Sequence, residues 1–350
     1  MLDFAHKLAD IAAKILKKHF RNLRSEDFRM KARMDPVTIA DTAVEKALVE
    51  ALAKEHPDHT ILAEEFTDTR TEGGPLWVID PIDGTNNFLH GIPNTCTSIA
   101  YLEDGVVQAA IVDAPFIGER FAAQRGQGAT LNGETIKVST FATLEEAMVC
   151  TGYADLRKYG DETNLDVWKT MAPKLSGLRR YGAAALDLCW VACGRFDGFW
   201  ERSLSPWDVA AGSLIIEEAG GVVVNIGQAP SFNPLNGSLV AANSELAPHL
   251  YDAIMAAIAN SKGEGEATDD NTTLAELKNE MRHFVSERAW DKFHNPKNVS
   301  MSIAIEAAEL MEIFQWLDLE KASELINDKE KYQHIKEELA DILAYTMSLA

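Results

Sequence analysis

A segment without large apolar residues divides this sequence into two parts. Between positions 260 and 271 it reads Asn-Ser-Lys-Gly-Glu-Gly-Glu-Ala-Thr-Asp-Asp-Asn. Because such a segment has nothing to bury, residues 260–272 are predicted to form a flexible acidic linker. The chain is therefore expected to fold as two domains, residues 1–259 and 273–350. The length of 350 residues agrees with this division, since a domain usually has about 100–200 residues.

The charge and composition exclude several classes of protein. The formal net charge is −21, and such a surface repels phosphate backbones, so we expect no nucleic-acid partner. An acidic protein can still bind anionic substrates where its carboxylates hold metal ions. No apolar run approaches the roughly 18 residues that cross a bilayer, so we expect no membrane partner. The N-terminus has amphipathic spacing rather than that of a signal peptide, and the four cysteines form no CxxC pair; both indicate a cytoplasmic protein.

The two parts differ in hydrophobic periodicity. Residues 1–55 have mostly helical spacing, and residues 141–258 mix helical and strand patterns. Residues 273–350 have helical periodicity throughout, and Thr273-Leu-Ala-Glu276 has the form of a capping box that opens a helix. Short apolar runs between 60 and 140, separated by Gly, Pro and Asn, predict strands at Leu76–Ile79, Thr97–Leu102, Val106–Val112 and Arg120–Ala123. The first part is thus mixed α and β, and the second is all-α.

The segment Asp80-Pro-Ile-Asp-Gly-Thr85 follows one of these strands. Pro81 cannot continue a hydrogen-bonded ladder, so the chain is expected to turn there, with Asp80 and Asp83 converging across the bend. Ile82 would then offer its backbone carbonyl, and Gly84 would let the backbone approach a ligand closely. A short helix opening at Thr85 would direct free N–H groups toward an anion.

Two further acidic segments fit the same site. Glu64 and Glu65 end an apolar run, and Asp208 lies at the start of a long apolar helix. Oxygen ligands without His or Cys suit a hard cation such as Mg²⁺. Each segment alone has an ordinary explanation, because Asp-Pro and Asp-Gly are common in turns and acidic residues at strand ends are usually solvated.

Taken together, these segments resemble the inositol monophosphatase family over residues 1–258. Asp80–Thr85 matches the central motif of that family, Trp207-Asp-Val-Ala-Ala-Gly212 its C-terminal motif, and Asp35–Asp41 its upstream element. The resemblance implies an α+β fold in αβαβα layers and an Mg²⁺-dependent phosphatase. It implies that Thr85, with Glu64 or Asp41, activates water, and that Gly84 and Thr85 hold the phosphate. The implied metal ligands are Glu64, Asp80, the Ile82 carbonyl, Asp83 and Asp208.

The substrate stays open between two phosphate esters. Glu201 matches the family position that accepts hydrogen bonds from the inositol ring, which favours inositol monophosphate or a similar small polyol phosphate. A carboxylate there could equally bind the ammonium group of histidinol phosphate. An alternative of another class is a binding or regulatory protein that keeps the fold without significant activity, with the C-terminal part as an oligomerisation module.

A second acidic group occurs on the predicted C-terminal helices. Glu306 and Glu309 are three residues apart on one helix face, and Glu338 and Asp341 repeat that spacing further on. Two helices packed along their apolar faces would bring these four carboxylates together, which is costly without a cation. Acidic pairs at this spacing are also ordinary on solvated helix faces.

Residues 273–350 resemble the all-α MazG-like and dCTP-pyrophosphatase superfamily, whose ExxE…ExxD metal motif these four residues match. The resemblance implies Mg²⁺-assisted cleavage of a nucleoside triphosphate, with His294, Lys297 and Asn298 at phosphate or sugar and Trp316 stacked on the base. The family has further helical sequence beyond the position of Ala350, so the bundle is expected to be incomplete and to gain cover from a partner chain in a homo-oligomer, such as a dimer.

Overall fold

The computed structural model divides into two compact units, Met1–Glu264 and Gly265–Ala350. It describes residues 1–32, 35–71, 73–153, 164–228, 232–263, 277–278, 281–282, 285, 290 and 294–349. Helix α7 (Leu246–Gly263) continues into the predicted linker and ends at a glycine, a common helix terminator. The rest of that linker and the predicted cap at 273–276 lie outside the described residues.

The larger sheet of the first unit has seven strands in the order β3-β4-β5-β6-β7-β8-β9. The strands β3 and β4 are parallel, and the other neighbours are antiparallel. All four strands predicted between 60 and 140 are confirmed, as parts of β4, β5, β6 and β7. The bounds are β3 (Thr60–Ala63), β4 (Pro75–Asp83), β5 (Cys96–Glu103), β6 (Val106–Ala114), β7 (Glu119–Gln124), β8 (Ala129–Leu131) and β9 (Glu134–Thr135).

Strand β4 does not end at Asp80, contrary to the sequence prediction. It continues through Pro81 to Asp83, and the register against β5 shifts between Asp80 and Asp83. Asp80 pairs with Ser98 and Asp83 with Cys96, so β4 contains one extra residue there. This is a β-bulge, a place where a strand tolerates proline because one residue is left out of the ladder.

The second sheet has five strands in the order β11-β10-β12-β14-β13. Strand β10 runs parallel to both neighbours, whereas β14 is antiparallel to β12 and β13. The bounds are β10 (Met148–Thr151), β11 (Gly177–Arg179), β12 (Gly198–Leu204), β13 (Gly221–Asn225) and β14 (Gly237–Asn243).

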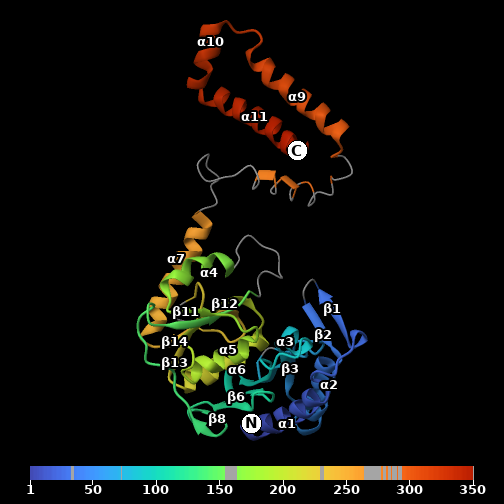
Figure 1. The fold of residues 1–350 in the computed structure, drawn as a ribbon, viewed down its shortest axis with the longest axis vertical. Helices are drawn as coiled ribbons and strands as arrows, with labels where there is room; N and C mark the ends of the chain where they lie inside the picture. Colours follow the sequence, from blue (N-terminus) through green and yellow to red (C-terminus); the bar gives the residue numbers. More distant parts are fainter. Residues whose placement is uncertain are drawn as a thin grey trace. The chain divides into compact units, whose positions relative to one another are not determined.

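Helices and sheets of this unit stack in five layers. The helices α1 (Leu2–His19) and α2 (Ile39–Glu55) pack on one face of the large sheet, against Trp77 and Ile79. The helices α5 (Ala184–Ala192) and α6 (Pro206–Glu218) lie between the two sheets (Figure 1). The outer face of the second sheet is covered by α7 and α4 (Asn164–Met171). The predicted αβαβα arrangement is thus confirmed.

The N-terminal region is mostly helical, as its sequence predicted, but a hairpin that was not predicted interrupts it. Between α1 and α2 the chain forms an antiparallel hairpin of β1 (Phe28–Ala32) and β2 (Asp35–Thr38). The run Phe-Arg-Met-Lys-Ala of β1 alternates apolar and charged residues, which is the pattern of a strand with one exposed face. This alternation is short, and the helical spacing on either side masks it.

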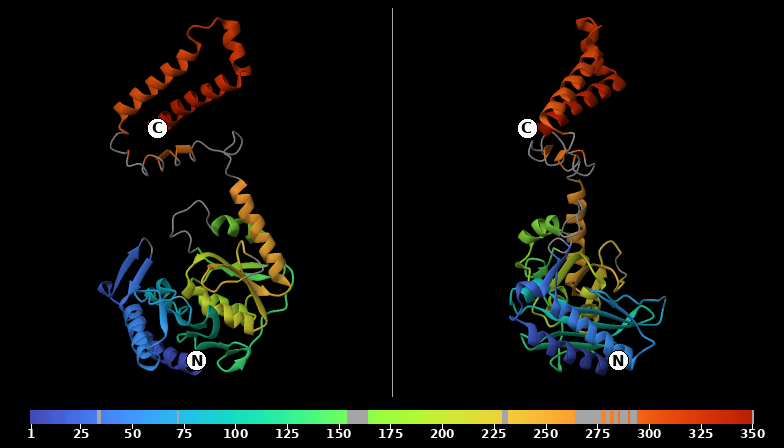
Figure 2. Two further views of the ribbon diagram at one scale, coloured as in Figure 1. Left: turned by 180° about the vertical axis from the view of Figure 1, so that it is seen from behind. Right: turned by 90° about the vertical axis from the view of Figure 1, so that its right-hand side faces the viewer.

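The second unit is helical in the part that the structure describes. It contains α9 (Pro296–Phe314), α10 (Leu319–Glu324), a 3₁₀ turn at Leu325–Asn327 and α11 (Lys329–Leu349). Helices α9 and α11 pack against each other along their length (Figure 2). Across the described residues of both units, we find no helix with the length and apolarity that crossing a membrane requires.

Candidate active site

Three carboxylates, two of them buried and one half-buried, meet at the edge of the large sheet. Asp80, Asp83 and Asp208 each offer an oxygen, and these atoms lie within 4.8 Å of one another. In a regular strand Asp80 and Asp83 would point to opposite faces, because side chains alternate. The extra residue of the β-bulge in β4 places both on the same side.

Backbone hydrogen bonds fix each of these carboxylates. Asp80 Oδ1 accepts from the Ile82 amide at 2.9 Å, and Asp83 Oδ2 accepts from the Ala185 amide of α5 at 2.7 Å. Asp208 lies in the first turn of α6, where its Oδ2 accepts from the Ser205 amide at 2.7 Å in a capping box. The local fold therefore sets the directions of all three side chains before any ligand binds.

Burial and mutual repulsion raise the pKa values of this cluster. Burial raises the pKa of Asp83 to about 6, and the nearby Glu64 carboxylate adds to that effect. The pKa values of Asp80 and Asp208 are raised well above the ordinary value, first by burial and then by their acidic neighbours. Carboxylates at this separation need protons or a bound cation. An all-oxygen ligand set fits a hard divalent cation such as Mg²⁺.

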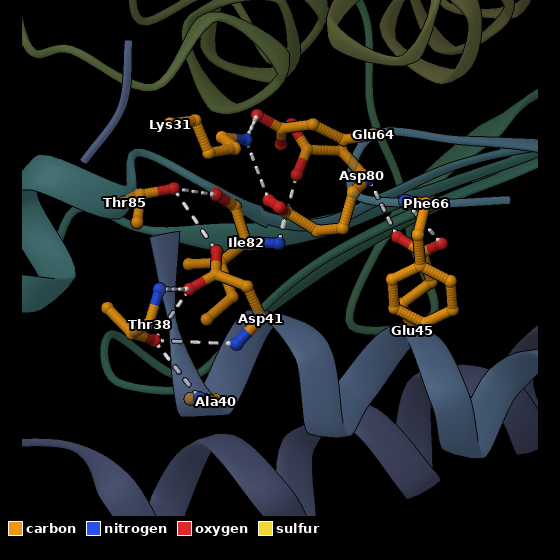
Figure 3. A network of polar contacts seen from close by, with 11 residues as sticks. Lys31, Thr38, Ala40, Asp41, Glu45, Glu64, Phe66, Asp80, Ile82 and Thr85 are labelled. Carbon is orange, nitrogen blue, oxygen red and sulfur yellow. Dashed lines mark hydrogen bonds and ion pairs between the residues drawn. The ribbon is translucent and has the colours of Figure 1, made fainter. Parts of the chain in front are cut away.

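A threonine–aspartate pair lies beside the cluster (Figure 3). Thr85 Oγ1 is 3.2 Å from Asp41 Oδ1 and 3.0 Å from the Ile82 carbonyl oxygen, and its single proton can go to either. The other oxygen of Asp41 accepts from the amide and the hydroxyl of Thr38, at 2.8 and 2.6 Å, at the start of α2. Burial raises the pKa of Asp41 to about 6. Asp41 is thus a carboxyl group in a fixed position, with a pKa close to neutrality.

Glu64 and Glu65 follow the end of β3, and both form ion pairs with the same lysine. Lys31 Nζ of β1 lies 2.9 Å from Glu64 Oε1 and 2.9 Å from Glu65 Oε1 (Figure 3). Burial alone would lower the pKa of Lys31, but the two carboxylates outweigh it and raise that pKa. Burial raises the pKa of Glu65 to about 7. The buried Glu45 carboxylate accepts from the amides of Glu65 and Phe66 at 2.8 and 3.1 Å, which fixes this turn.

Gly84 joins the bulged strand to the short helix α3 (Thr85–Leu89). Its φ of +85° is a conformation that side chains disfavour. A Cβ atom there would also lie 3.0 Å from the Asn94 carbonyl oxygen. The predicted helix start at Thr85 is therefore confirmed, and only glycine fits at its N-cap.

A cavity of about 120 Å³ extends from the carboxylate cluster toward the second sheet. Its lining includes Glu64, Asp80, Asp83, Thr85 and Asp208 at one end, and Gly152, Arg180, Asp187 and Glu201 beyond them. Glu201, on β12, is 5% exposed. Gly152 leaves room for it, because a Cβ at that position would collide with the Glu201 carboxylate. The structure thus brings all of the predicted residues of the first site to one cavity or its edge.

Comparisons with known proteins agree with this geometry. The model of the inositol monophosphatase family matches residues 1–262. The chain belongs to the inositol monophosphatase family. It is 40% identical to Nus factor SuhB of Pseudomonas aeruginosa, over 70% of this chain and 92% of that one. It is 38% identical to inositol-1-monophosphatase of Rhizobium meliloti, over 69% of this chain and 91% of that one.

Solved structures show the same fold. Thermotoga maritima IMPase superposes with a TM-score of 0.67 at 34% identity, covering 74% of this chain and 98% of that one. Inositol monophosphatase from Anabaena superposes with a TM-score of 0.64 at 36% identity, covering 73% and 95%. The likeness extends over the first unit, the part that contains the cavity.

The sequence analysis missed four groups in this unit. Lys31 reaches the site from the unpredicted hairpin, and the Ala185 amide belongs to a helix without a motif of its own. Asp187 and Arg180 line the cavity far along the chain from the metal-site motifs. One signal was available, because Asp187 is the single charged residue in the apolar run Ala183–Ala192.

The second acidic group forms between α9 and α11. Glu306, Glu309 and Glu338 each offer an oxygen within 4.8 Å of the others, and Asp341 lies close enough for its charge to raise the pKa of Glu306. Glu338 is 8% exposed, and its Oε2 has no hydrogen-bond partner among the described residues. The model of the MazG-like family matches residues 301–350, so the chain joins two families.

Only some of the other residues predicted for the second site line the cavities beside the acidic group. His294 lines a cavity with Glu306 and Asp341, and Asn298 lines a neighbouring one with His294. Trp316 is 87% exposed at the end of α9, and neither it nor Lys297 lines these two cavities.

Proposed function

We propose that the first unit is an Mg²⁺-dependent phosphomonoesterase. The observation that carries this proposal is the meeting of three backbone-fixed carboxylates, two of them buried, beside the Thr85–Asp41 pair. A structural role alone would not require six acidic residues to line one cavity, since their repulsion destabilises the fold without a cation. Membership of the inositol monophosphatase family supports the same reaction class.

Glu64, Asp80, Asp83, Asp208 and the Ile82 carbonyl would hold the metal. Bound divalent cations would neutralise the phosphate oxygens and make a water molecule more acidic. The Lys31 ammonium, now 2.9 Å from Glu64, must then share or release that carboxylate.

Thr85 and Asp41 would prepare the attacking water. When Thr85 donates its proton to Asp41, its oxygen can accept a proton from water, and Asp41 becomes the final base. The amides at Gly84 and Thr85 would hold the phosphate, because the first amides of a helix have no acceptor within that helix.

Glu201 would select the leaving group. We favour inositol monophosphate or a similar small polyol phosphate, with histidinol phosphate as the alternative. Phosphate release with Mg²⁺ from myo-inositol 1-phosphate and from histidinol phosphate, at equal concentration, tests the choice. Preference for the inositol ester supports a hydroxyl-binding Glu201, and the reverse preference supports an ammonium-binding one. Release from neither ester would remove the proposed function.

A second activity is proposed for the C-terminal unit. The convergence of Glu306, Glu309 and Glu338 favours Mg²⁺-assisted pyrophosphohydrolysis of a nucleoside triphosphate. Asp341 would complete the ligand set, and His294, Lys297, Asn298 and Trp316 would contact the nucleotide. Pyrophosphate release from nucleoside triphosphates, lost in Glu309→Gln and kept in Asp83→Asn, would support it. No release from any of the common triphosphates would contradict it.

A role in binding nucleic acid, rather than in catalysis, needs a separate test. Several relatives carry the name Nus factor SuhB, whereas a net charge of −21 disfavours contact with nucleic acid. We expect no mobility shift of RNA at physiological salt, and a shift would favour the binding class.

We also propose a cytoplasmic homo-oligomer, such as a dimer. Analytical ultracentrifugation of the chain with and without residues 273–350 would measure its mass.

A further inference from the structure

Asp187 is a buried carboxyl group that lines the cavity. Neither the metal site nor the Thr85–Asp41 pair uses it. It lies in the first turn of α5, is 2% exposed and lines the same cavity as Glu201. It does not belong to the group of carboxylates that converge on the metal position. Its place is farther along the cavity, beside the second sheet.

The Oδ1 atom of Asp187 is fully buried and has no hydrogen-bond partner among the described residues. Leaving a buried acceptor unsatisfied costs about 1–3 kcal/mol, and more for a charged group. Other buried carboxylates of this unit avoid that cost. Asp113 is paired with Arg120 at 2.7 Å, and Asp197 accepts from the Met148 amide at 2.7 Å. An unsatisfied carboxyl group that lines a cavity is therefore placed for a ligand.

Two charged neighbours narrow the chemistry of that ligand. Burial raises the pKa of Asp187 well above its ordinary value, Glu201 raises it further, and the Arg180 guanidinium opposes that rise. Arg180 also lines the cavity, where it lies over the Tyr153 ring at 5.9 Å. The positive charge of Arg180 offsets part of the negative charge of these carboxyl groups, which weakens the attraction of a substrate ammonium group. A neutral hydroxyl donor does not depend on that attraction.

We propose that Asp187 is a specificity-determining residue, which together with Glu201 forms a two-carboxyl subsite that binds hydroxyl groups of a polyol phosphate. Glu201 comes from β12 and Asp187 from α5, so two neighbouring ring hydroxyls could each meet one acceptor. The inference rests on the proposed phosphatase function and names its substrate class as polyol rather than amine.

The test compares substrates with and without hydroxyl groups on the full chain with Mg²⁺. Asp187→Ala is expected to raise KM for myo-inositol 1-phosphate about tenfold, the loss of one hydrogen bond. For phenyl phosphate, whose ring has no hydroxyl, kcat and KM should stay within about twofold of the wild type. Asp187→Asn keeps one acceptor oxygen, so its KM should lie between those of the wild type and Asp187→Ala.

Asp113→Asn is the matched control, because it alters a buried carboxylate that already has a partner and lies outside the cavity. It should lower Tm and leave the ratio of kcat/KM for the two substrates unchanged. Asp187→Ala should not lower Tm, because it removes an unsatisfied group. If Asp187→Ala lowers Tm and slows both substrates equally, Asp187 is structural and the inference is wrong.

Two other outcomes separate the inference from the function on which it rests. A wild-type enzyme that cleaves both esters, with no change of KM in either Asp187 variant, overturns the subsite and leaves the phosphatase standing. A KM that rises for histidinol phosphate, and not for the inositol ester, overturns the hydroxyl assignment. A wild-type chain that cleaves no phosphomonoester defeats both.

Discussion

The two acidic clusters of this chain hold their carboxylates in different ways. In the first unit, a strand bulge and a helix cap supply them, and the amides of Ile82, Ala185 and Ser205 fix their directions. In the second unit, they stand on two helices, where Glu309 is exposed, Glu306 is half-buried and Glu338 is buried. A buried, fixed cluster is preorganised for ligands, whereas side chains on solvated helices must lose rotamer freedom when they bind.

Electrostatic repulsion among the carboxylates also differs between the two clusters. Burial raises the pKa of Asp83 to about 6 and the pKa values of Asp80 and Asp208 further. In the second cluster, burial and the neighbouring carboxylates raise the pKa of Glu306. Water screens the repulsion among these carboxylates. The first cluster should therefore depend strongly on its cation for stability, and the second weakly.

The largest expected effect is the loss of a ligand from the buried cluster. Asp83→Asn should reduce Mg²⁺-dependent phosphate release on the order of 10³-fold, because a neutral amide holds a hard cation poorly. Glu309→Gln should leave that rate unchanged. Initial rates and circular dichroism of both variants test the comparison, and a near-normal rate for Asp83→Asn would refute the metal site.

Stability without metal should fall as pH rises. The raised pKa values of Asp41 and Asp83, both about 6, mean that the folded state binds more protons than the unfolded state. This stabilisation is complete below the unfolded pKa near 4 and is lost as pH rises through 6, with about 3 kcal/mol from Asp41 alone.

Urea unfolding at pH 5 and pH 8 in EDTA measures this loss. Mg²⁺ at pH 8 should restore stability to the wild type and not to Asp83→Asn. Equal stability at both pH values would show that the buried carboxylates are not strained, and the contrast with the exposed cluster would disappear.

Thr85→Val should separate chemistry from binding within the first unit. Valine keeps the shape and removes the hydroxyl that joins water to Asp41, so kcat should fall about 10²-fold with little change in KM. Steady-state kinetics on the preferred ester would measure both. Thr38→Val is the matched variant: it removes a hydroxyl that orients Asp41 and caps α2, and a smaller loss of kcat is expected. An equal loss in both would argue against a direct role for Thr85.

The smallest expected effect lies in the exposed cluster. Glu306→Gln should change the free energy of unfolding by no more than about 0.5 kcal/mol, the usual range for surface substitutions. It should nevertheless abolish any pyrophosphate release by the second unit. Thermal unfolding and a pyrophosphate assay together decide this, and a large change of Tm would show that the second cluster is as constrained as the first.

Local patterns in the sequence determined much of this molecule. Apolar runs of strand length located β4 to β7, and helical periodicity located α9 and α11, because both signals depend on neighbours within a few residues. The family motifs placed Glu64, Asp80, Asp83, Thr85 and Asp208 in one site before their geometry was known.

Tertiary structure alone decided the details that make the site work. Pro81 indicates a break in the strand, but only pairing with β5 turns it into a bulge that aligns Asp80 with Asp83. Lys31 reaches Glu64 from a strand 33 positions earlier in the chain. Asp187 acquires its neighbour Glu201 because α5 packs beside β12. Sequence carries the chemistry of these side chains, whereas their distances depend on long-range packing that no local pattern records.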